Sequence, residues 1–232
     1  MPIMNTALSK TRDKKISVLI SGRGSNLAAL LDAIDAGRIQ GRVVRVLSQR
    51  ADAAGLQHAE KRGIPTTVVD VKAYPTRDAF DVALGDAIAM DAPDLVVLAG
   101  FMRVLGAAIV QRFAGRMINI HPALLPSYPG LHTHQRALAD GVKWHGCTVH
   151  FVTPEVDVGP IVGQSVVPVL PGDDETTLAA RVLDAEHRLL EDAVRWYCAD
   201  RLSVDGHTVT LCNAAEPPTS FQHPKDQISD FR

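Results

Sequence analysis

The chain has 232 residues, a formal net charge of −2 and a hydrophobic content of 46%. This length suits one large α/β domain or two small ones, and the near-neutral charge argues against a general affinity for nucleic acids or anionic membranes. No apolar run reaches the ~18 residues of a membrane span, and the polar, basic segment 1–15 lacks the apolar core of a signal peptide.

The three cysteines, Cys147, Cys198 and Cys212, fit neither a disulfide framework nor a zinc site by number or spacing. A reducing compartment is the simpler interpretation. We therefore expect a cytoplasmic protein, and we interpret residues 1–15 as a disordered leader.

Short apolar runs alternate with segments of helical spacing through the first half of the chain. The expected strands are 16–20, 43–47, 66–69, 94–99 and 117–120, and the helices between them are 26–36, 53–62, 77–90 and 106–113. This alternation predicts a mostly parallel, doubly wound α/β sheet of the Rossmann-like kind.

The second half has a different pattern. A short helix is expected at 134–140, strands at 147–153 and 163–169, a long amphipathic helix at 176–196, and a hairpin with an Asp-Gly turn at 204–210. The order of the two strands suggests an antiparallel addition to the sheet. From about residue 213 to 232 the chain is polar and contains prolines, so we expect a poorly ordered tail.

Ser21-Gly-Arg-Gly-Ser-Asn26 joins the first expected strand to the first helix. Glycines let a ligand approach the backbone closely, and a helix amino terminus offers free N–H groups to an anion. The third glycine of a dinucleotide fingerprint and the Lys-Ser/Thr pair of a triphosphate loop are both missing, so a single phosphate monoester fits best. The alternative is a tight turn in which Ser or Asn merely caps the helix.

Asn119 and His121 stand two residues apart at the end of an expected strand, before the proline-containing segment 122–129. Residues two apart in a strand share a face, and ligands of open α/β sheets bind at this end of the strands. A second loop supplies Asp157. Amide, imidazole and carboxylate together suit acyl transfer to an amine. The alternatives are a core histidine bonded to a carbonyl and an ordinary turn aspartate.

Three other features have simpler interpretations. His132 and His134 lack a further ligand that would make a metal site, and Cys147 beside Gly146 is expected to be a packed thiol. The acidic run 173–175 is expected to be solvated and to cap the following helix.

Five segments in this order carry a resemblance to a known family: 21–26 (SGRGSN), 98–103 (LAGFMR), 119–126 (NIHPALLP), 129–134 (PGLHTH) and 150–160 (HFVT…D…GP). From about residue 16 to 210 the chain resembles the phosphoribosylglycinamide formyltransferases, folate-dependent enzymes of purine synthesis. The resemblance implies formyl transfer from 10-formyltetrahydrofolate to the amine of glycinamide ribonucleotide, with no metal and no nucleic-acid or membrane partner. A homodimer is compatible with the sequence.

The resemblance also implies the boundaries of the domain. A single formyltransferase domain would span 16–212, with a phosphate-binding half at 16–115 and a folate-binding and catalytic half at 116–212. Two positions depart from the family pattern: Ala123 replaces a serine that is usual after His-Pro, and Val158 replaces a glycine that is common beside the aspartate.

Site residues follow from matching positions in the family motifs. The resemblance implies a catalytic trio of Asn119, His121 and Asp157, in which Asn119 and a protonated His121 stabilise the oxyanion and Asp157 keeps His121 charged. The implied substrate contacts are Gly24, Ser25 and Asn26 for the ribonucleotide phosphate and Glu186 for the glycinamide. The implied folate contacts are Arg77, Met102, Arg103, Val104, Leu105, Asn119 and the loop from Val152 to Asp157.

Three related or competing functions share parts of this pattern. A formyltetrahydrofolate deformylase would give the formyl group to water, but it normally carries a regulatory domain before the catalytic one. A methionyl-tRNA formyltransferase would need a separate tRNA-binding domain. A non-catalytic nucleotide- or folate-binding protein of the same fold would not need to retain the trio.

Overall fold

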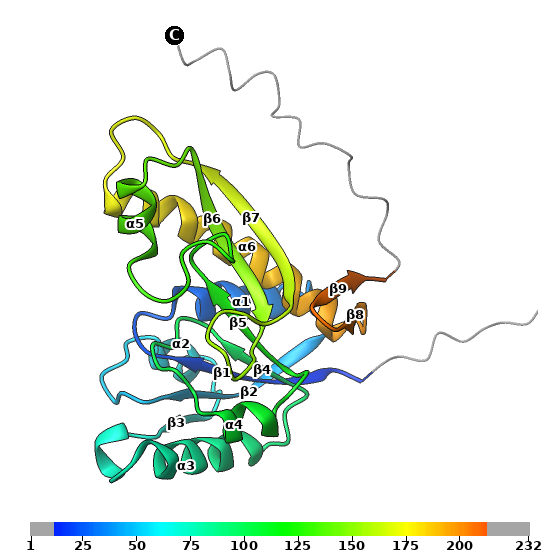
Figure 1. Ribbon diagram of the computed structural model, residues 1–232. Helices are drawn as coiled ribbons and strands as arrows, with labels where there is room; N and C mark the ends of the chain where they lie inside the picture. Colours follow the sequence, from blue (N-terminus) through cyan, green and yellow to red (C-terminus); the bar gives the residue numbers. More distant parts are fainter. Residues whose placement is uncertain (1–11, 213–232) are drawn as a thin grey trace, which may run out of the picture.

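The structure is a computed structural model that describes residues 12–212, and within them seven strands form one sheet in the order β3-β2-β1-β4-β5-β6-β7 (Figure 1). The strands are β1 Lys14–Ile20, β2 Gly41–Ser48, β3 Thr66–Val68, β4 Leu95–Leu98, β5 Met117–His121, β6 Trp144–Phe151 and β7 Ile161–Pro168. Strands β1 to β5 are parallel, and β6 and β7 join antiparallel. The predicted α/β fold with an antiparallel addition is confirmed.

Helices cover both faces of the sheet. They are α1 Ser25–Asp35, α2 Leu56–Glu60, α3 Arg77–Ala89, α4 Ala107–Arg112, α5 Thr133–Ala139 and α6 Glu175–Cys198, with a 3₁₀ turn η1 at Val71–Ala73. α1 and α6 lie side by side on one face, and α3 and α4 lie on the other (Figure 1). A separate hairpin, β8 Leu202–Asp205 and β9 Thr208–Leu211, follows α6 and confirms the predicted hairpin, although its two turn residues are Gly206 and His207 because Asp205 pairs with Thr208.

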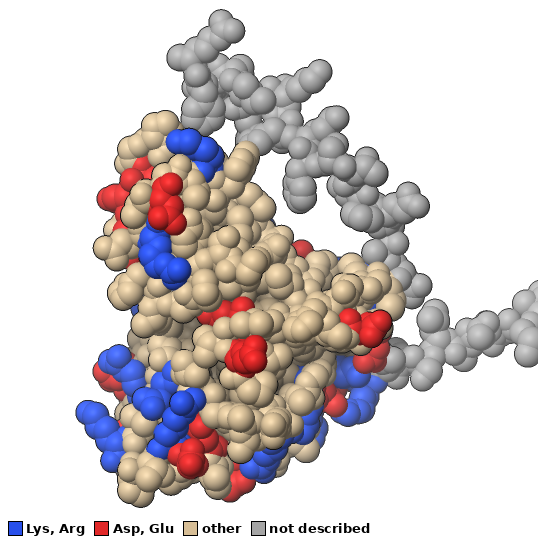
Figure 2. All heavy atoms as spheres, in the orientation of Figure 1, with Lys and Arg blue, Asp and Glu red and all other residues tan. Residues whose placement is uncertain are grey.

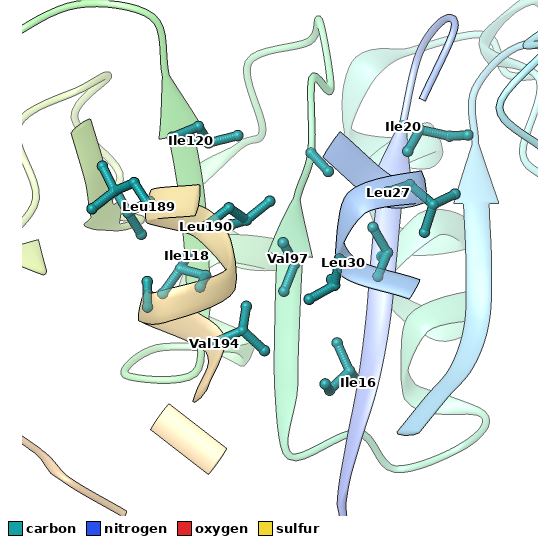
Figure 3. Packing of buried hydrophobic residues seen from close by; sticks show 14 of the residues in the cluster. Ile16, Ile20, Leu27, Leu30, Val97, Ile118, Ile120, Leu189, Leu190 and Val194 are labelled. Atoms are coloured by element: carbon teal, nitrogen blue, oxygen red, sulfur yellow. The ribbon is translucent and has the colours of Figure 1, made fainter. Parts of the chain in front are cut away.

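Two apolar cores follow from the alternation of side chains along the strands. Val18 and Ile20 of β1 point toward α1 and α6, whereas Leu19 between them points toward α3 and α4. Figure 3 shows the first core, where α6 lays Leu189, Leu190 and Val194 against residues of β4 and β5. Burying an aliphatic side chain of this size contributes about 1.5–3 kcal/mol, so both faces hold the strand ends in place.

The strand order reverses between β1 and β4, which are neighbours although β2 and β3 intervene in sequence. In open α/β sheets this switch point opens a crevice at the carboxyl ends of the strands. The segment after β1, the segment after β4 and the end of β5 therefore meet along one edge of the sheet.

Two sequence expectations need correction. β1 begins at Lys14, so a leader that extends to residue 15 is wrong: the backbone of Lys14 and Lys15 pairs with β2 although their side chains are polar. Asp173 is not solvated, because its side chain is only 5% exposed and bonds Arg181 through both oxygens. Asp174 does cap α6, since its carboxylate accepts a bond from the Thr177 amide.

The rest of the expected leader, residues 1–11, and the expected tail, 213–232, lie outside the described residues. Cys147 is fully buried, as expected of a packed thiol. Among the helices of residues 12–212, none is long and apolar enough to cross a membrane.

Candidate active site

The glycine loop after β1 packs closely against the backbone of Gly55. Gly24 precedes α1 in the left-handed region, with φ of 72°, and an added Cβ would lie 2.7 Å from the Cα of Gly55. A side chain at position 24 would therefore be both strained and blocked. Because Gly24 is the N-cap and no side chain caps α1, the alternative of a mere Ser or Asn cap is wrong. The first N–H groups of α1 remain available to an anion.

Asn26 ties this loop to the long helix α6. Its side-chain NH2 group donates to Oε2 of Glu186 over 2.7 Å, and both side chains are buried. Burial raises the pKa of Glu186 to about 7, although the bond from Asn26 acts in the opposite direction. The side-chain oxygen of Asn26 is buried without a partner among the described residues. Asn26 can thus meet a phosphate through its main-chain N–H, while its side chain holds Glu186.

A pocket of about 960 Å³ opens beside the loop. Its lining comes from residues 21–26 after β1, residues 49–52 after β2, residues 70–72 around η1, and residues 99, 100, 102 and 103 after β4. The lining includes four cationic side chains and two acidic ones: Arg23, Arg50, Lys72, Arg103, Asp52 and Asp70. Figure 2 shows one face of the molecule, on which Lys and Arg side chains in the lower part are interspersed with Asp and Glu. The cationic excess suits an anionic ligand.

The carboxyl end of β5 carries Asn119 and His121, and the antiparallel register of β6 sets their neighbours. Asn119 lies directly opposite His150, and its Nδ2 is 3.2 Å from His150 Nε2. The other ring nitrogen of His150, Nδ1, lies 2.9 Å from the carbonyl oxygen of Phe151. A carbonyl only accepts, so Nδ1 carries the ring proton and Nε2 accepts from Asn119.

Asp157 reaches the same place from the loop between β6 and β7. Its Oδ2 lies 3.5 Å from His121 Nδ1, its Oδ1 lies 3.6 Å from His150 Nε2, and the Gly130 amide donates to Oδ2 over 2.8 Å. The residue has a φ of 58°, a strained conformation that Asp tolerates better than most residues. Burial acts to raise the pKa of Asp157, but the pKa is held below its usual value, and the hydrogen bond from the Gly130 amide is one interaction that lowers it.

Two interactions and burial set the protonation of His121 in the unliganded site. Its Nε2 lies 2.9 Å from the carbonyl oxygen of Tyr128, so Nε2 carries a proton. Burial lowers the pKa of His121 below its usual value, although the Tyr128 carbonyl and Asp157 act in the opposite direction. Desolvation therefore outweighs the carboxylate and favours the neutral ring in the unliganded site, while the expected charged His121 belongs to the step in which the oxyanion forms and stays a prediction.

The segment 102–105, which the resemblance assigns to the folate, lies after β4 at the rim of the pocket. Arg77, at the start of α3, donates to the carbonyl oxygen of Val104 over 2.8 Å, and the guanidinium of Arg103 lies over the ring of Phe80. Met102 and Val104 expose their side chains, whereas Leu105 is buried.

The other expected positions lie near this site. Val152 packs against the core beside α3, and its amide bonds the carbonyl of Met117. Ala123 is fully buried and Val158 is exposed. His134 contacts a third histidine, since its Nδ1 lies 3.2 Å from Nε2 of His145, whereas His132 is exposed.

The structure thus brings Asn119, His121 and Asp157 together and places His150 among them. Sequence reasoning included His150 in a motif but did not treat it as a site residue. The sequence placed His150 in the expected strand 147–153, which could have suggested it as a site residue. Only the register between β5 and β6 shows that His150 faces Asn119.

Comparisons with known proteins agree with this geometry. The family model described as formyl transferase matches residues 14–194. A phosphoribosylglycinamide formyltransferase from Escherichia coli is 47% identical over 206 residues, which cover 89% of this chain and 97% of the relative. The solved structure of glycinamide ribonucleotide transformylase 1 from Symbiobacterium toebii has a TM-score of 0.85 and 47% identity, covering 87% of this chain and 95% of its own.

A formyltetrahydrofolate deformylase from Pseudomonas syringae pv. tomato is also similar in structure. It has a TM-score of 0.82 and 28% identity, and the match covers 88% of this chain and 67% of the deformylase.

Proposed function

The chain belongs to the formyl transferase family, and on that basis we propose that it transfers the formyl group of 10-formyltetrahydrofolate to the amine of glycinamide ribonucleotide. The glycine loop and the first turn of α1 would bind the phosphate through main-chain N–H groups. Glu186, held by Asn26 at 2.7 Å, would receive the glycinamide part of the same substrate. The folate would lie along residues 102–105, opposite the loop that carries Asp157.

The reaction needs no protein nucleophile, because the substrate amine attacks the formyl carbon itself. A new N–C bond forms, the carbonyl electrons move to oxygen, and the tetrahedral oxyanion needs hydrogen-bond donors. One N–H of Asn119 bonds His150, which orients the amide so that its second N–H can face the oxyanion. The bond between the formyl carbon and the folate nitrogen then breaks, and the carbonyl reforms.

One proton must move from the attacking amine to the departing folate nitrogen during this exchange. His121 Nδ1 is bare in the neutral ring and lies 3.5 Å from Asp157. As negative charge develops on the oxyanion, a proton on this nitrogen would be stabilised by the oxyanion and the carboxylate together. We therefore assign His121 the role of a base that takes the amine proton, stabilises the oxyanion as a cation, and returns the proton to the folate nitrogen as the C–N bond breaks. Asp157 would stabilise that cation.

The observation that carries this proposal is the convergence of Asn119, His121 and Asp157 at the end of β5. The neighbouring strand β4 leads into residues 99–103, which line the cationic pocket together with the phosphate-type loop. A hydrolase that gives the formyl group to water would have no use for that loop or for Glu186. The thiols of Cys147 and Cys198 are free and buried, which supports our proposal of a cytoplasmic location because disulfides are rare there.

The test is a steady-state assay that follows the appearance of tetrahydrofolate with and without glycinamide ribonucleotide. We expect turnover only when the ribonucleotide is present, with saturation in both substrates. Turnover that does not depend on the ribonucleotide would favour the deformylase, and binding of both ligands without turnover would favour a non-catalytic protein.

A further inference from the structure

Ser21 is a junction between two parts of the site that are distant in sequence. Its hydroxyl oxygen accepts a bond from the main-chain N–H of Met102 over 2.7 Å. The side-chain amide of Gln49 lies against the same oxygen, with Nε2 at 2.7 Å and Oε1 at 3.0 Å. Ser21 and Gln49 are both only 6% exposed. Three segments, which follow β1, β2 and β4, therefore meet at one hydroxyl group.

The order of the strands explains this meeting. Ser21 directly follows β1, and β1 lies between β2 and β4. Ser21 opens the phosphate loop, whereas Met102 opens the segment that we assign to the folate, and both residues line the same pocket. The hydroxyl thus connects the nucleotide side of the site to its folate side.

The segment 102–105 has few other means of holding its shape. The side chains of Met102 and Val104 are 66% and 53% exposed, so packing alone does not fix their backbone. Leu105 is buried and Arg103 lies over the Phe80 ring. Two hydrogen bonds add to these contacts: Ser21 accepts from the amide of Met102, and Arg77 donates to the carbonyl of Val104. Removing the hydroxyl would leave the Met102 amide without its acceptor.

We propose that Ser21 is a positioning residue for the folate-facing segment 102–105, although by sequence it belongs to the phosphate loop. The proposal rests on the assignment of that segment to the folate under the proposed function. The proposal predicts that a change at Ser21, in the phosphate loop, weakens binding of the folate and leaves binding of the ribonucleotide unchanged.

The experiment compares Ser21→Ala with Ser17→Ala in steady-state assays with both substrates varied. A hydrogen bond contributes about 0.5–1.5 kcal/mol, so Ser21→Ala is expected to raise the KM for 10-formyltetrahydrofolate about three- to tenfold. The KM for the ribonucleotide and kcat should stay within about twofold of the wild type. Ser17 is a matched control, because it lies on β1, the strand that Ser21 directly follows, is fully buried, and its hydroxyl has no hydrogen-bond partner among the described residues.

Two further arms keep the test decisive. Ser21→Thr retains the hydroxyl and should restore most of the folate KM, and Gln49→Met should cause a smaller rise than Ser21→Ala because Met102 keeps its acceptor. Calorimetric titration with tetrahydrofolate tests the role of Ser21 separately from the proposed function. Weaker binding in Ser21→Ala than in Ser17→Ala would support the role of Ser21 even if the wild type showed no ribonucleotide-dependent turnover. If Ser21→Ala does not fold, titration of Ser21→Cys takes its place, because a thiol is a weak acceptor for the Met102 amide.

Three results would overturn the proposal. The first is an unchanged folate KM in Ser21→Ala, the second is an equal or larger rise in the ribonucleotide KM, and the third is the same folate defect in Ser17→Ala. An unchanged affinity for tetrahydrofolate in a folded Ser21→Ala or Ser21→Cys variant would have the same effect.

Discussion

Replacing Asp157 by Asn removes one negative charge while keeping the size of the side chain. Asn also tolerates the positive φ of 58° at this position, and its amide oxygen can still accept the bond from Gly130. The loop between β6 and β7 should therefore keep its shape. What is lost is the carboxylate 3.5 Å from Nδ1 of His121.

The size of the effect follows from that distance. Two unit charges about 4 Å apart interact by about 4 kcal/mol at an effective dielectric constant of ~20, and about 1.4 kcal/mol corresponds to a tenfold change in rate. If His121 becomes charged only in the transition state, Asp157→Asn should lower kcat by about a hundredfold to a thousandfold. Because Asp157 does not touch the phosphate loop, the dissociation constant of glycinamide ribonucleotide should change little.

The assay is a comparison of kcat, with ribonucleotide binding measured by calorimetry. Glu155→Gln is the matched control, because it removes the same charge from the same loop at an exposed position two residues away. A loss of less than tenfold in Asp157→Asn, or an equal loss in Glu155→Gln, would refute the electrostatic role of Asp157.

Two further predictions concern the nucleotide side of the site. Gly24→Ala should raise the ribonucleotide KM at least tenfold, because its Cβ would meet Gly55 at 2.7 Å; Gly37→Ala has the same φ of 72° but open space and should leave that KM unchanged. Glu186 has its pKa raised from 4.5 to about 7, so the folded state binds more protons than the unfolded state between these pH values, and stability falls as pH rises through them. In urea unfolding, the free energy of unfolding of the wild type should fall by about 3 kcal/mol between pH 4.5 and about 7, relative to that of Glu186→Gln. Parallel profiles of unfolding free energy against pH for the two proteins would contradict this prediction.

The fold was predictable because its signals are local. The apolar run at β4 has both faces buried, as its unbroken hydrophobic pattern indicates, and the long amphipathic pattern of α6 differs from the observed helix by one or two residues at its ends. Asn119 and His121 could be placed on one face from their spacing alone. Asp157 could be proposed as a loop carboxylate, and the resemblance supported that choice, but its distance from His121 could not be predicted, since no local pattern relates a loop residue to a strand more than thirty positions earlier.

The remaining features depend on register and burial, which a single sequence does not specify. His150 faces Asn119 only because β6 pairs with β5 in one of several equivalent registers. Ser21 bonds Met102 only because the strand order makes β1 and β4 neighbours. The neutral state of His121 follows from its burial, which outweighs a charge partner that the sequence did suggest.

The central claim is that a bound amine, and not water, takes the formyl group at His121. A single-turnover experiment with a donor that carries an isotopic label in the formyl group tests it most directly, with the label followed into the ribonucleotide or into formate. We predict that nearly all of the label appears in the ribonucleotide and that His121→Ala slows this transfer at least a hundredfold. Recovery of the label as formate, at a rate that does not depend on the ribonucleotide, would contradict the account.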